Sequence, residues 1–168
     1  GDEVIIPTPC WVSYVDQVKM VDGVPVTVAT TESNHFKATV EQLEAARTEK
    51  TKVLLLNSPS NPTGMIYTRD ELEAIGNWAV EHNIIILADD IYGRLVYNGN
   101  EFTPISSISE AIRKQTVVVN GVSKTYAMTG WRVGFAVAEE EIISGMAKVI
   151  SQTTSNLTAV SQYAAIEA

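Results

Sequence analysis

Three short apolar runs constrain the fold of this chain more than any other feature of its sequence. They lie at residues 53–56 (VLLL), 84–88 (IIILA) and 117–119 (VVV), and none shows the polar alternation of a half-exposed strand. Strands that are apolar on both faces are typical of a parallel sheet that helices cover on both sides. The runs therefore predict an α/β fold with three layers, in which a mostly parallel sheet lies between helices.

Amphipathic segments separate these runs, and several have recognisable helix starts. Residues 68–71 (TRDE) form a capping box, and Leu72, Ile75 and Ala79 follow on one helix face. Other helices are predicted to begin at residues 39–42 and to span about residues 12–20 and 140–150, and weaker strands are predicted at residues 4–6, 26–28 and 134–138. This dense alternation predicts right-handed crossovers and a doubly wound sheet within a single domain.

The composition excludes several classes of protein. Hydrophobic residues make up 45% of the 168, and 12 Lys+Arg stand against 20 Asp+Glu, which gives a formal net charge of −8. A chain this apolar is not a disordered linker, and a chain this acidic is not expected to bind nucleic acid, because phosphate neutralisation needs excess cations. No apolar run approaches the roughly 20 residues that cross a bilayer, so no membrane partner is expected.

Cysteine and histidine are scarce in this sequence. Cys10 is alone, and His35 and His82 have no metal-ligand companions nearby, so neither a disulfide nor a metal site is predicted. This usage fits a reducing cytoplasm. The sequence does not start with Met and ends on helix-forming residues without a cap, from which we expect a fragment of a longer protein.

Polar side chains follow each of the three apolar runs directly. They lie at residues 57–64, 89–92 and 120–124. In a doubly wound sheet, ligands bind beyond the carboxyl ends of the strands, so an amide, a carboxylate with a phenol, and an amine should converge on one crevice. Neighbouring residues of a strand point to opposite faces, so only one of Asp89 and Asp90 should enter this crevice.

Most of the candidate residues have a structural as well as a functional interpretation. Lys124 is either a solvated lysine or an amine that forms Schiff bases with carbonyls. Asp89 either caps the following turn or pairs with a pyridinium nitrogen, and Asn61 taken alone is a turn former. Trp11 either fills a core or offers a flat face to an aromatic ring. Arg132, which lies among small residues eight positions after Lys124, suits a phosphate.

Together, four sequence blocks resemble the class I/II pyridoxal-phosphate-dependent aminotransferases. Residues 121–134 (GVSKTYAMTGWRVG) are similar to the lysine-attachment signature of that family, and residues 57–64 (NSPSNPTG), 89–92 (DDIY) and 9–14 (PCWVSY) match three further blocks in the expected order. The resemblance runs from Asp2 to Ala168 and is nearest to the bacterial aspartate aminotransferase-like branch of fold type I. A nucleotide-binding Rossmann enzyme is disfavoured, because no G-x-G-x-x-G or G-x-x-x-x-G-K-[ST] motif follows a strand.

The resemblance implies three catalytic side chains. Lys124 would form a Schiff base with pyridoxal 5'-phosphate and then move the proton between the substrate Cα and the cofactor C4′. Asp89 would pair with the pyridine nitrogen and keep the ring an electron sink. Tyr92 would hydrogen-bond the phenolic oxygen of the ring.

The resemblance also implies residues that only bind the cofactor. Asn61 would hydrogen-bond the same phenolic oxygen from a cis Asn61–Pro62 peptide, Trp11 would stack on the ring face, and Arg132 would hold the phosphate. The chain departs from the family pattern at two positions. Gly121 stands where a serine often donates to the phosphate, and Asp90 stands where glutamate is more usual.

For the whole chain, the resemblance implies that residues 1–168 are most of the cofactor-binding large domain of an aminotransferase, without its N-terminal segment and small domain. The complete enzyme would move an amino group between an L-amino acid, with aspartate as one candidate, and a 2-oxo acid, as a cytoplasmic homodimer. The fragment alone would be inactive or impaired. Two alternatives stay open, because the same fold and lysine motif serve C–S/β-elimination lyases and similar domains sense effectors in transcription regulators.

Overall fold

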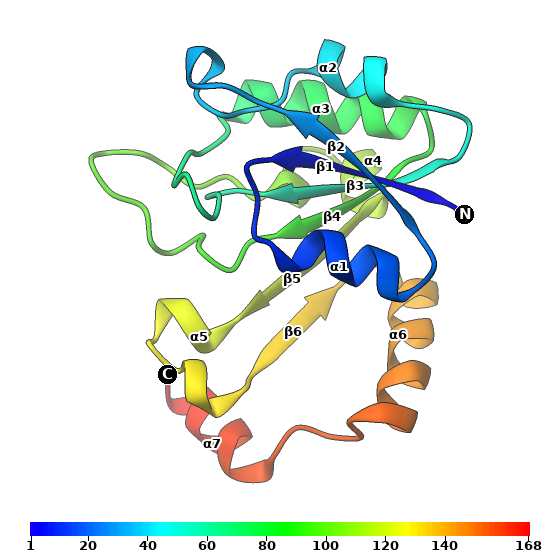
Figure 1. The fold of residues 1–168 in the computed structure, drawn as a ribbon. Helices are drawn as coiled ribbons and strands as arrows, with labels where there is room; N and C mark the ends of the chain where they lie inside the picture. Colours follow the sequence, from blue (N-terminus) through cyan, green and yellow to red (C-terminus); the bar gives the residue numbers. More distant parts are fainter.

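A six-stranded sheet forms the centre of the molecule, and the computed structural model describes all of residues 1–168 around it (Figure 1). The strand order is β2-β1-β3-β4-β5-β6. Adjacent strands pair in parallel except β6, which runs antiparallel to β5. The prediction of a mostly parallel sheet is therefore confirmed. The strands are β1 (Glu3–Thr8), β2 (Val24–Ala29), β3 (Thr51–Asn57), β4 (Ile85–Asp89), β5 (Thr116–Gly121) and β6 (Gly134–Val137).

Helices lie on both faces of this sheet, which confirms the predicted three layers. Figure 1 shows α2 and α3 on one face and α1 on the other. None of the helices combines the length and the apolar character that a bilayer crossing needs. The helices are α1 (Ser13–Met20), α2 (Val40–Ala46), α3 (Arg69–Glu81), α4 (Glu110–Lys114), α5 (Val122–Thr125), α6 (Glu140–Thr153) and α7 (Ala159–Glu167), with 3-10 turns at Glu32–Asn34, Ile105–Ser107 and Thr129–Trp131.

Helix α3 begins where the capping box predicts. The Thr68 hydroxyl accepts a hydrogen bond from the Glu71 backbone N–H at 3.3 Å, and the Glu71 carboxylate accepts one from the Thr68 N–H at 2.7 Å. Leu72, Ile75 and Ala79 are all buried on the face that packs against the sheet. Local capping and one apolar face together explain why this segment is the longest helix of its layer.

The two faces of the sheet are covered unequally. A cluster of 16 buried residues, including Leu43, Ile75 and Ile112, packs on the side of α2, α3 and α4. The cluster beneath α1 has only four: Ile6, Tyr14, Val18 and Leu55. Helix α6 buries no residue at all. The sheet is therefore anchored on one face, whereas the other face is covered only in part.

The carboxyl ends of β3, β4 and β5 lie next to one another. Asn57 at the end of β3 is in register with Asp89 at the end of β4, and Asp89 is in register with Val119 of β5. Because β6 runs antiparallel, its first residue, Gly134, pairs with Gly121 at the end of β5. The segment between β5 and β6 thus folds back to the edge at which the site is predicted.

Candidate active site

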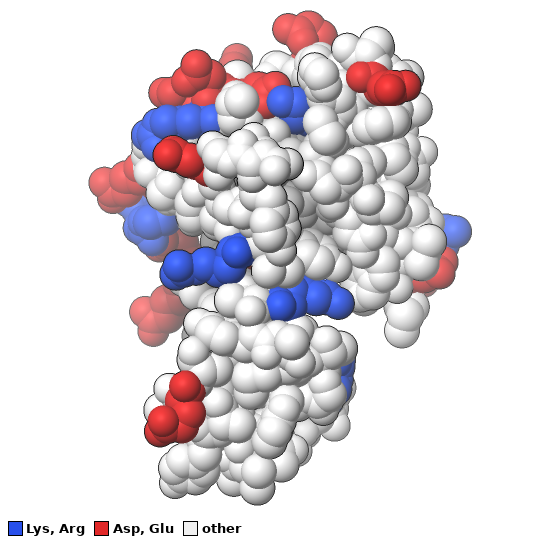
Figure 2. Space-filling view, turned by 90° about the vertical axis from the view of Figure 1, so that its left-hand side faces the viewer, with Lys and Arg blue, Asp and Glu red and all other residues white.

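A cavity of about 500 Å³ opens at the carboxyl edge of the sheet. Figure 2 views the molecule from the side at which the parallel strands end, and Lys and Arg side chains lie across its middle. The walls of the cavity include every residue that the sequence predicts for the site: Trp11, Asn61, Asp89, Tyr92, Lys124 and Arg132. The fold therefore brings together residues that lie up to 121 positions apart in the chain, from Trp11 to Arg132.

Lys124 presents its amine to this cavity from α5, the short helix that follows β5. Its Nζ atom lies 5.8 Å from the centroid of the Tyr92 ring, which is the distance of a cation–π contact. No carboxylate lies within ion-pair distance of this amine. The amine is thus held over a phenol ring and is free to react, which favours the nucleophilic interpretation over a structural salt bridge.

Asp89 is the only acid that lines the cavity, and two hydrogen bonds hold it. Its Oδ2 atom accepts a hydrogen bond from the Tyr14 hydroxyl at 2.6 Å, and its Oδ1 atom accepts one from the Ile91 backbone N–H at 3.2 Å. Tyr14 belongs to α1 and is 5% exposed. Burial, and then the hydrogen bond to Asp89, raise the pKa of the Tyr14 phenol, so that it remains a donor at neutral pH.

Asp90 lies outside the cavity, as strand alternation predicts for one of the two adjacent aspartates. Its side chain is buried, and no cation pairs with it. Burial, and then the negative charge of Asp89, raise the pKa of Asp90 to about 7. Asp89 is therefore the only carboxylate of the pair that can face a ligand in the cavity.

Asn57 ties two parts of the site together. Its side-chain Nδ2 donates to the backbone carbonyl oxygen of Asp89 at 2.8 Å, and its Oδ1 accepts a hydrogen bond from the Asn61 backbone N–H at 2.7 Å. The Asn61–Pro62 peptide is cis, as the resemblance implies. One amide thus fixes the end of β4 to the loop that carries Asn61.

The loop between β5 and β6 carries Arg132. Arg132 has a positive φ of 56°, and its Nη1 donates to the Thr129 carbonyl oxygen at 2.9 Å. A Cβ atom on Gly121 would lie 2.6 Å from the Val133 carbonyl oxygen. A serine at position 121 would therefore collide with this loop, which explains in physical terms why glycine stands there.

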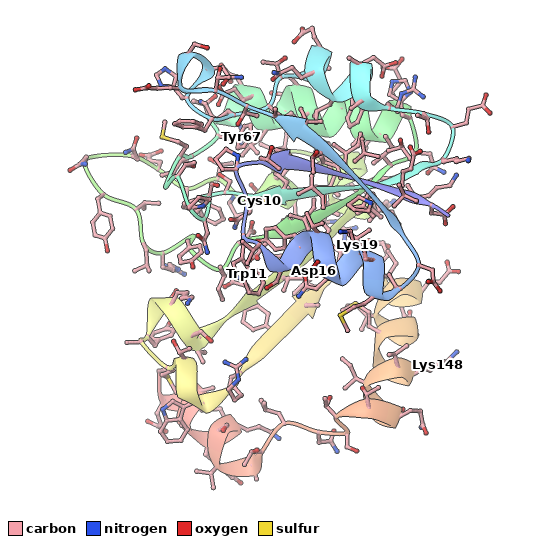
Figure 3. The ribbon with its side chains drawn as sticks, in the orientation of Figure 1. Cys10, Trp11, Asp16, Lys19, Tyr67 and Lys148 are labelled. Atoms are coloured by element: carbon pink, nitrogen blue, oxygen red, sulfur yellow. The ribbon has the colours of Figure 1, made fainter.

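Trp11 lies in the loop just before α1, on the cavity side of that helix (Figure 3). Its indole is 42% exposed, and its ring is perpendicular to the ring of Tyr14 at a centroid distance of 5.4 Å. Such an edge-to-face contact holds the indole without covering both of its faces. The exposed indole is therefore able to stack on a ligand ring. A tryptophan that filled the hydrophobic core would have no free face for such a ligand.

Two residues of the site, Tyr14 and Asn57, are not among those that the sequence predicts. Tyr14 belongs to the same sequence block as Trp11, residues 9–14 (PCWVSY), so the sequence already places it close to the site. Asn57 directly follows the apolar run at 53–56, so the rule for strand ends already points to it. Their hydrogen bonds to Asp89, however, span 75 and 32 positions of the chain and are visible only in the fold.

The chain is similar to known proteins along its whole length. The family described as aminotransferase class I and II matches residues 1–168. An asparagine–oxo-acid transaminase of Streptococcus mutans is 75% identical over 167 residues, which are 99% of this chain and 42% of that protein. An aspartate aminotransferase of Bacillus sp. strain YM-2 is 56% identical over 168 residues, which are 100% of this chain and 43% of that protein. The chain thus spans less than half the length of these relatives.

Solved structures agree with these sequence matches. The aspartate aminotransferase of Thermus thermophilus with maleate superimposes with a TM-score of 0.94 at 41% identity, covering 99% of this chain and 43% of that one. The aromatic aminotransferase of Pyrococcus horikoshii gives a TM-score of 0.95 at 40% identity, covering 99% of this chain and 44% of that one. The α/β fold predicted from the sequence is therefore shared with both.

Proposed function

The chain belongs to the family of class I and II aminotransferases, and from this premise we propose that the full-length protein carrying it is an aminotransferase that uses pyridoxal 5'-phosphate. The reaction moves an amino group between an L-amino acid and a 2-oxo acid. One observation carries this proposal: six side chains of the required chemistry line a single cavity at the strand ends. Residues 1–168 are, in this proposal, most of the cofactor-binding large domain.

The residues of the cavity fit this cofactor. Its volume of about 500 Å³ lies within the range of small-molecule sites. Its walls offer at least one partner for each part of the cofactor: an amine for the aldehyde, a carboxylate for the ring nitrogen, a phenol and an amide for the ring oxygen, an indole for the ring face and a guanidinium for the phosphate. These partners are Lys124, Asp89, Tyr92, Asn61, Trp11 and Arg132, respectively.

In this proposal, Lys124 and Asp89 perform the proton chemistry. When bound, the cofactor supplies an aldehyde that condenses with amines and a ring that withdraws electrons from the substrate. The Lys124 Nζ would take the proton from the substrate Cα and deliver it to the carbon on the other side of the transferred nitrogen. The Asp89 carboxylate, which Tyr14 orients through a hydrogen bond, would pair with the protonated ring nitrogen. The ring of Tyr92, whose centroid lies 5.8 Å from the Lys124 Nζ, would help to position this amine.

The remaining side chains bind and orient the cofactor. Arg132 provides a guanidinium for the phosphate, and glycine at position 121 lets the backbone of the β5–β6 loop approach closely. Asn61, whose backbone N–H donates to the Asn57 side chain, would hydrogen-bond the ring oxygen with its own side chain. The indole of Trp11, which lines the cavity and contacts Tyr14 edge to face, would stack on the ring face.

We take the amino donor to be aspartate or its amide, asparagine. Support comes from the names of two relatives, an asparagine–oxo-acid transaminase at 75% identity and an aspartate aminotransferase at 56%. These names do not favour the two alternatives, a C–S/β-elimination lyase and an effector-sensing domain.

The exposed apolar side chains of α6 and α7 support a homodimeric assembly. The free Cys10 supports a cytoplasmic location.

Reductive labelling tests this proposal. The full-length protein is incubated with pyridoxal 5'-phosphate and reduced with borohydride, which donates hydride to the carbon–nitrogen double bond, and the labelled peptide is mapped. We expect the label at Lys124 in the wild type and no label there in Lys124→Ala. Lys148→Ala is the control and should be labelled as the wild type is, because Lys148 is an exposed lysine of α6 whose side chain points outward (Figure 3). A wild type without an adduct at Lys124 would sink the proposal.

The reaction type is tested separately with the same protein. We expect incubation with aspartate or asparagine and an unlabelled 2-oxo acid to yield the amino acid that corresponds to that 2-oxo acid. Release of a thiol, ammonia and a 2-oxo acid from a cysteine S-conjugate, with no amino acid formed from the added 2-oxo acid, would instead identify a lyase.

A further inference from the structure

The hydroxyl of Tyr14 has one partner in the whole structure, and that partner is Asp89. The Tyr14 Oη donates to the Asp89 Oδ2 at 2.6 Å, across 75 positions of sequence. The ring of Tyr14 is 5% exposed and packs with Ile6, Val18 and Leu55 beneath α1. A phenylalanine would serve this packing equally well. The hydroxyl is therefore explained by the carboxylate it contacts and not by the core.

This hydrogen bond orients the carboxylate of Asp89. A short O–H···O contact to a carboxylate is a charge-assisted bond, which is about twice as strong as a neutral one. Such a bond fixes the direction in which the carboxylate presents its remaining lone pairs. The Ile91 N–H occupies the other oxygen at a longer distance of 3.2 Å. Tyr14 is thus the only side chain that orients this acid.

The ring of Tyr14 contacts a second residue of the cavity. It lies perpendicular to the indole of Trp11 at a centroid distance of 5.4 Å. The hydroxyl contacts the acid at the end of β4, and the ring contacts the indole in the loop before α1. A single side chain therefore touches two separate walls of the cavity.

We propose that Tyr14 is a positioning residue of the cofactor site: its hydroxyl holds the Asp89 carboxylate aimed at the ring nitrogen, and its ring holds the indole of Trp11 against the ring face. This inference rests on the proposed function. It goes beyond that function because it assigns the tuning of the cofactor ring to a residue that does not touch the substrate.

The test compares Tyr14→Phe with the wild type in the full-length protein. Loss of the hydroxyl should weaken binding of pyridoxal 5'-phosphate by about tenfold, which is the size expected for one hydrogen bond to a charged group. The absorption band of the Lys124-bound cofactor should also change with pH at a higher midpoint than in the wild type. A ring nitrogen that is less firmly protonated withdraws less electron density, so the nitrogen of Lys124 becomes more basic.

Tyr67→Phe is the matched control. Tyr67 is also 5% exposed, and its hydroxyl accepts a hydrogen bond from the Ala38 backbone N–H at 2.8 Å, away from Asp89. We expect this variant to lose stability while its absorption midpoint remains that of the wild type. If Tyr14→Phe behaves like Tyr67→Phe, with lower stability alone and unchanged affinity and midpoint, Tyr14 is a core residue and the proposal is wrong.

Tyr14→Leu separates the role of the ring from that of the hydroxyl. It removes both, so its affinity for the cofactor should fall further than that of Tyr14→Phe, while the absorption midpoint should be the same in the two variants. Equal affinities would refute the contact with Trp11 as a contribution to binding. A wild type that forms no Lys124 adduct overturns the proposed function and this inference together, whereas an adduct in the wild type with no effect of Tyr14→Phe overturns only the inference.

Discussion

At the scale of residues, Asp89 and Asn61 are each held at the cavity by hydrogen bonds to another side chain. Tyr14 in α1 holds the Asp89 carboxylate, and Asn57 at the end of β3 holds both the Asp89 carbonyl and the Asn61 N–H. Residues in such contacts lose little further freedom when a ligand binds, because the fold has already ordered them. At the scale of single residues, the site is therefore built before any ligand enters it.

Asp90 leads to a prediction about pH. Burial and the nearby charge of Asp89 raise the pKa of Asp90 from 3.8 to about 7, so folding favours its protonated form. The stabilisation is fully present below pH 3.8 and is lost as the pH rises through about 7. Asp90→Asn cannot ionise at this position. As the pH rises from about 5 to 8, we expect its free energy of unfolding, measured with urea, to fall less than that of the wild type.

The control for this prediction is Asp70→Asn, which removes an exposed carboxylate in the first turn of α3. We expect its stability to follow the same pH dependence as the wild type over that range. Parallel curves for Asp90→Asn and the wild type would show that Asp90 does not titrate as proposed.

At the scale of elements, one carboxylate joins α2 to α3. Glu44 in α2 accepts hydrogen bonds from the Trp78 indole N–H at 2.9 Å and from Arg47 at 2.6 and 2.8 Å, and His82 Nε2 lies 3.3 Å from it. These contacts, that of Arg47 above all, lower the pKa of Glu44 from 4.5 to about 2. The stability they provide is present above pH 4.5 and is lost as the pH falls through about 2.

We therefore expect Glu44→Gln to be less stable than the wild type at pH 7 and to lose less additional stability on acidification from about pH 5 to 2. Chemical denaturation at several pH values measures both effects. Glu73→Gln, an exposed position of α3 without an ion pair, is the control and should behave as the wild type does. A difference between Glu44→Gln and the wild type that is constant across this range would contradict the assignment.

Local sequence patterns predict where most helices and strands lie, but they do not predict whether a strand runs parallel or antiparallel to its neighbour. The capping box at Thr68 and the apolar runs at 53–56 and 84–88 appear in the structure where the sequence predicts them. The antiparallel sense of β6 is different, because it depends on how the β5–β6 loop folds back and brings Gly134 beside Gly121. That return depends on the close approach of Val133 to Gly121, which is a tertiary contact.

At the scale of the whole molecule, the strand ends explain why so much of the site follows from the sequence. Parallel strands deliver their last residues to one edge, so Asn61, Asp89 and Lys124 could be grouped by position alone. Tyr14 could not be grouped this way, because it comes from a helix and acts through a residue 75 positions away. Sequence patterns thus locate the residues that face the ligand better than those that hold them in place.

Exposed apolar side chains on the last two helices predict how the 168-residue chain behaves on its own. Val149 and Ile150 on α6 and Val160, Tyr163 and Ile166 on α7 are all exposed. Surfaces of this kind favour association, so the chain should form oligomers whose size grows with concentration in sedimentation velocity. The double substitution Val160→Glu with Ile166→Glu should shift the population toward monomers. The substitution Gln152→Glu with Asn156→Asp, at exposed polar positions, adds the same charge and should not.

Salt separates apolar association from ionic association. The net charge of −8 makes the chains repel one another, and this repulsion is screened as salt increases. Association through the apolar faces of α6 and α7 should therefore strengthen between low and physiological salt. If the oligomers instead dissolve as salt is added, charged groups hold them together, and the apolar side chains of α6 and α7 are not the contact.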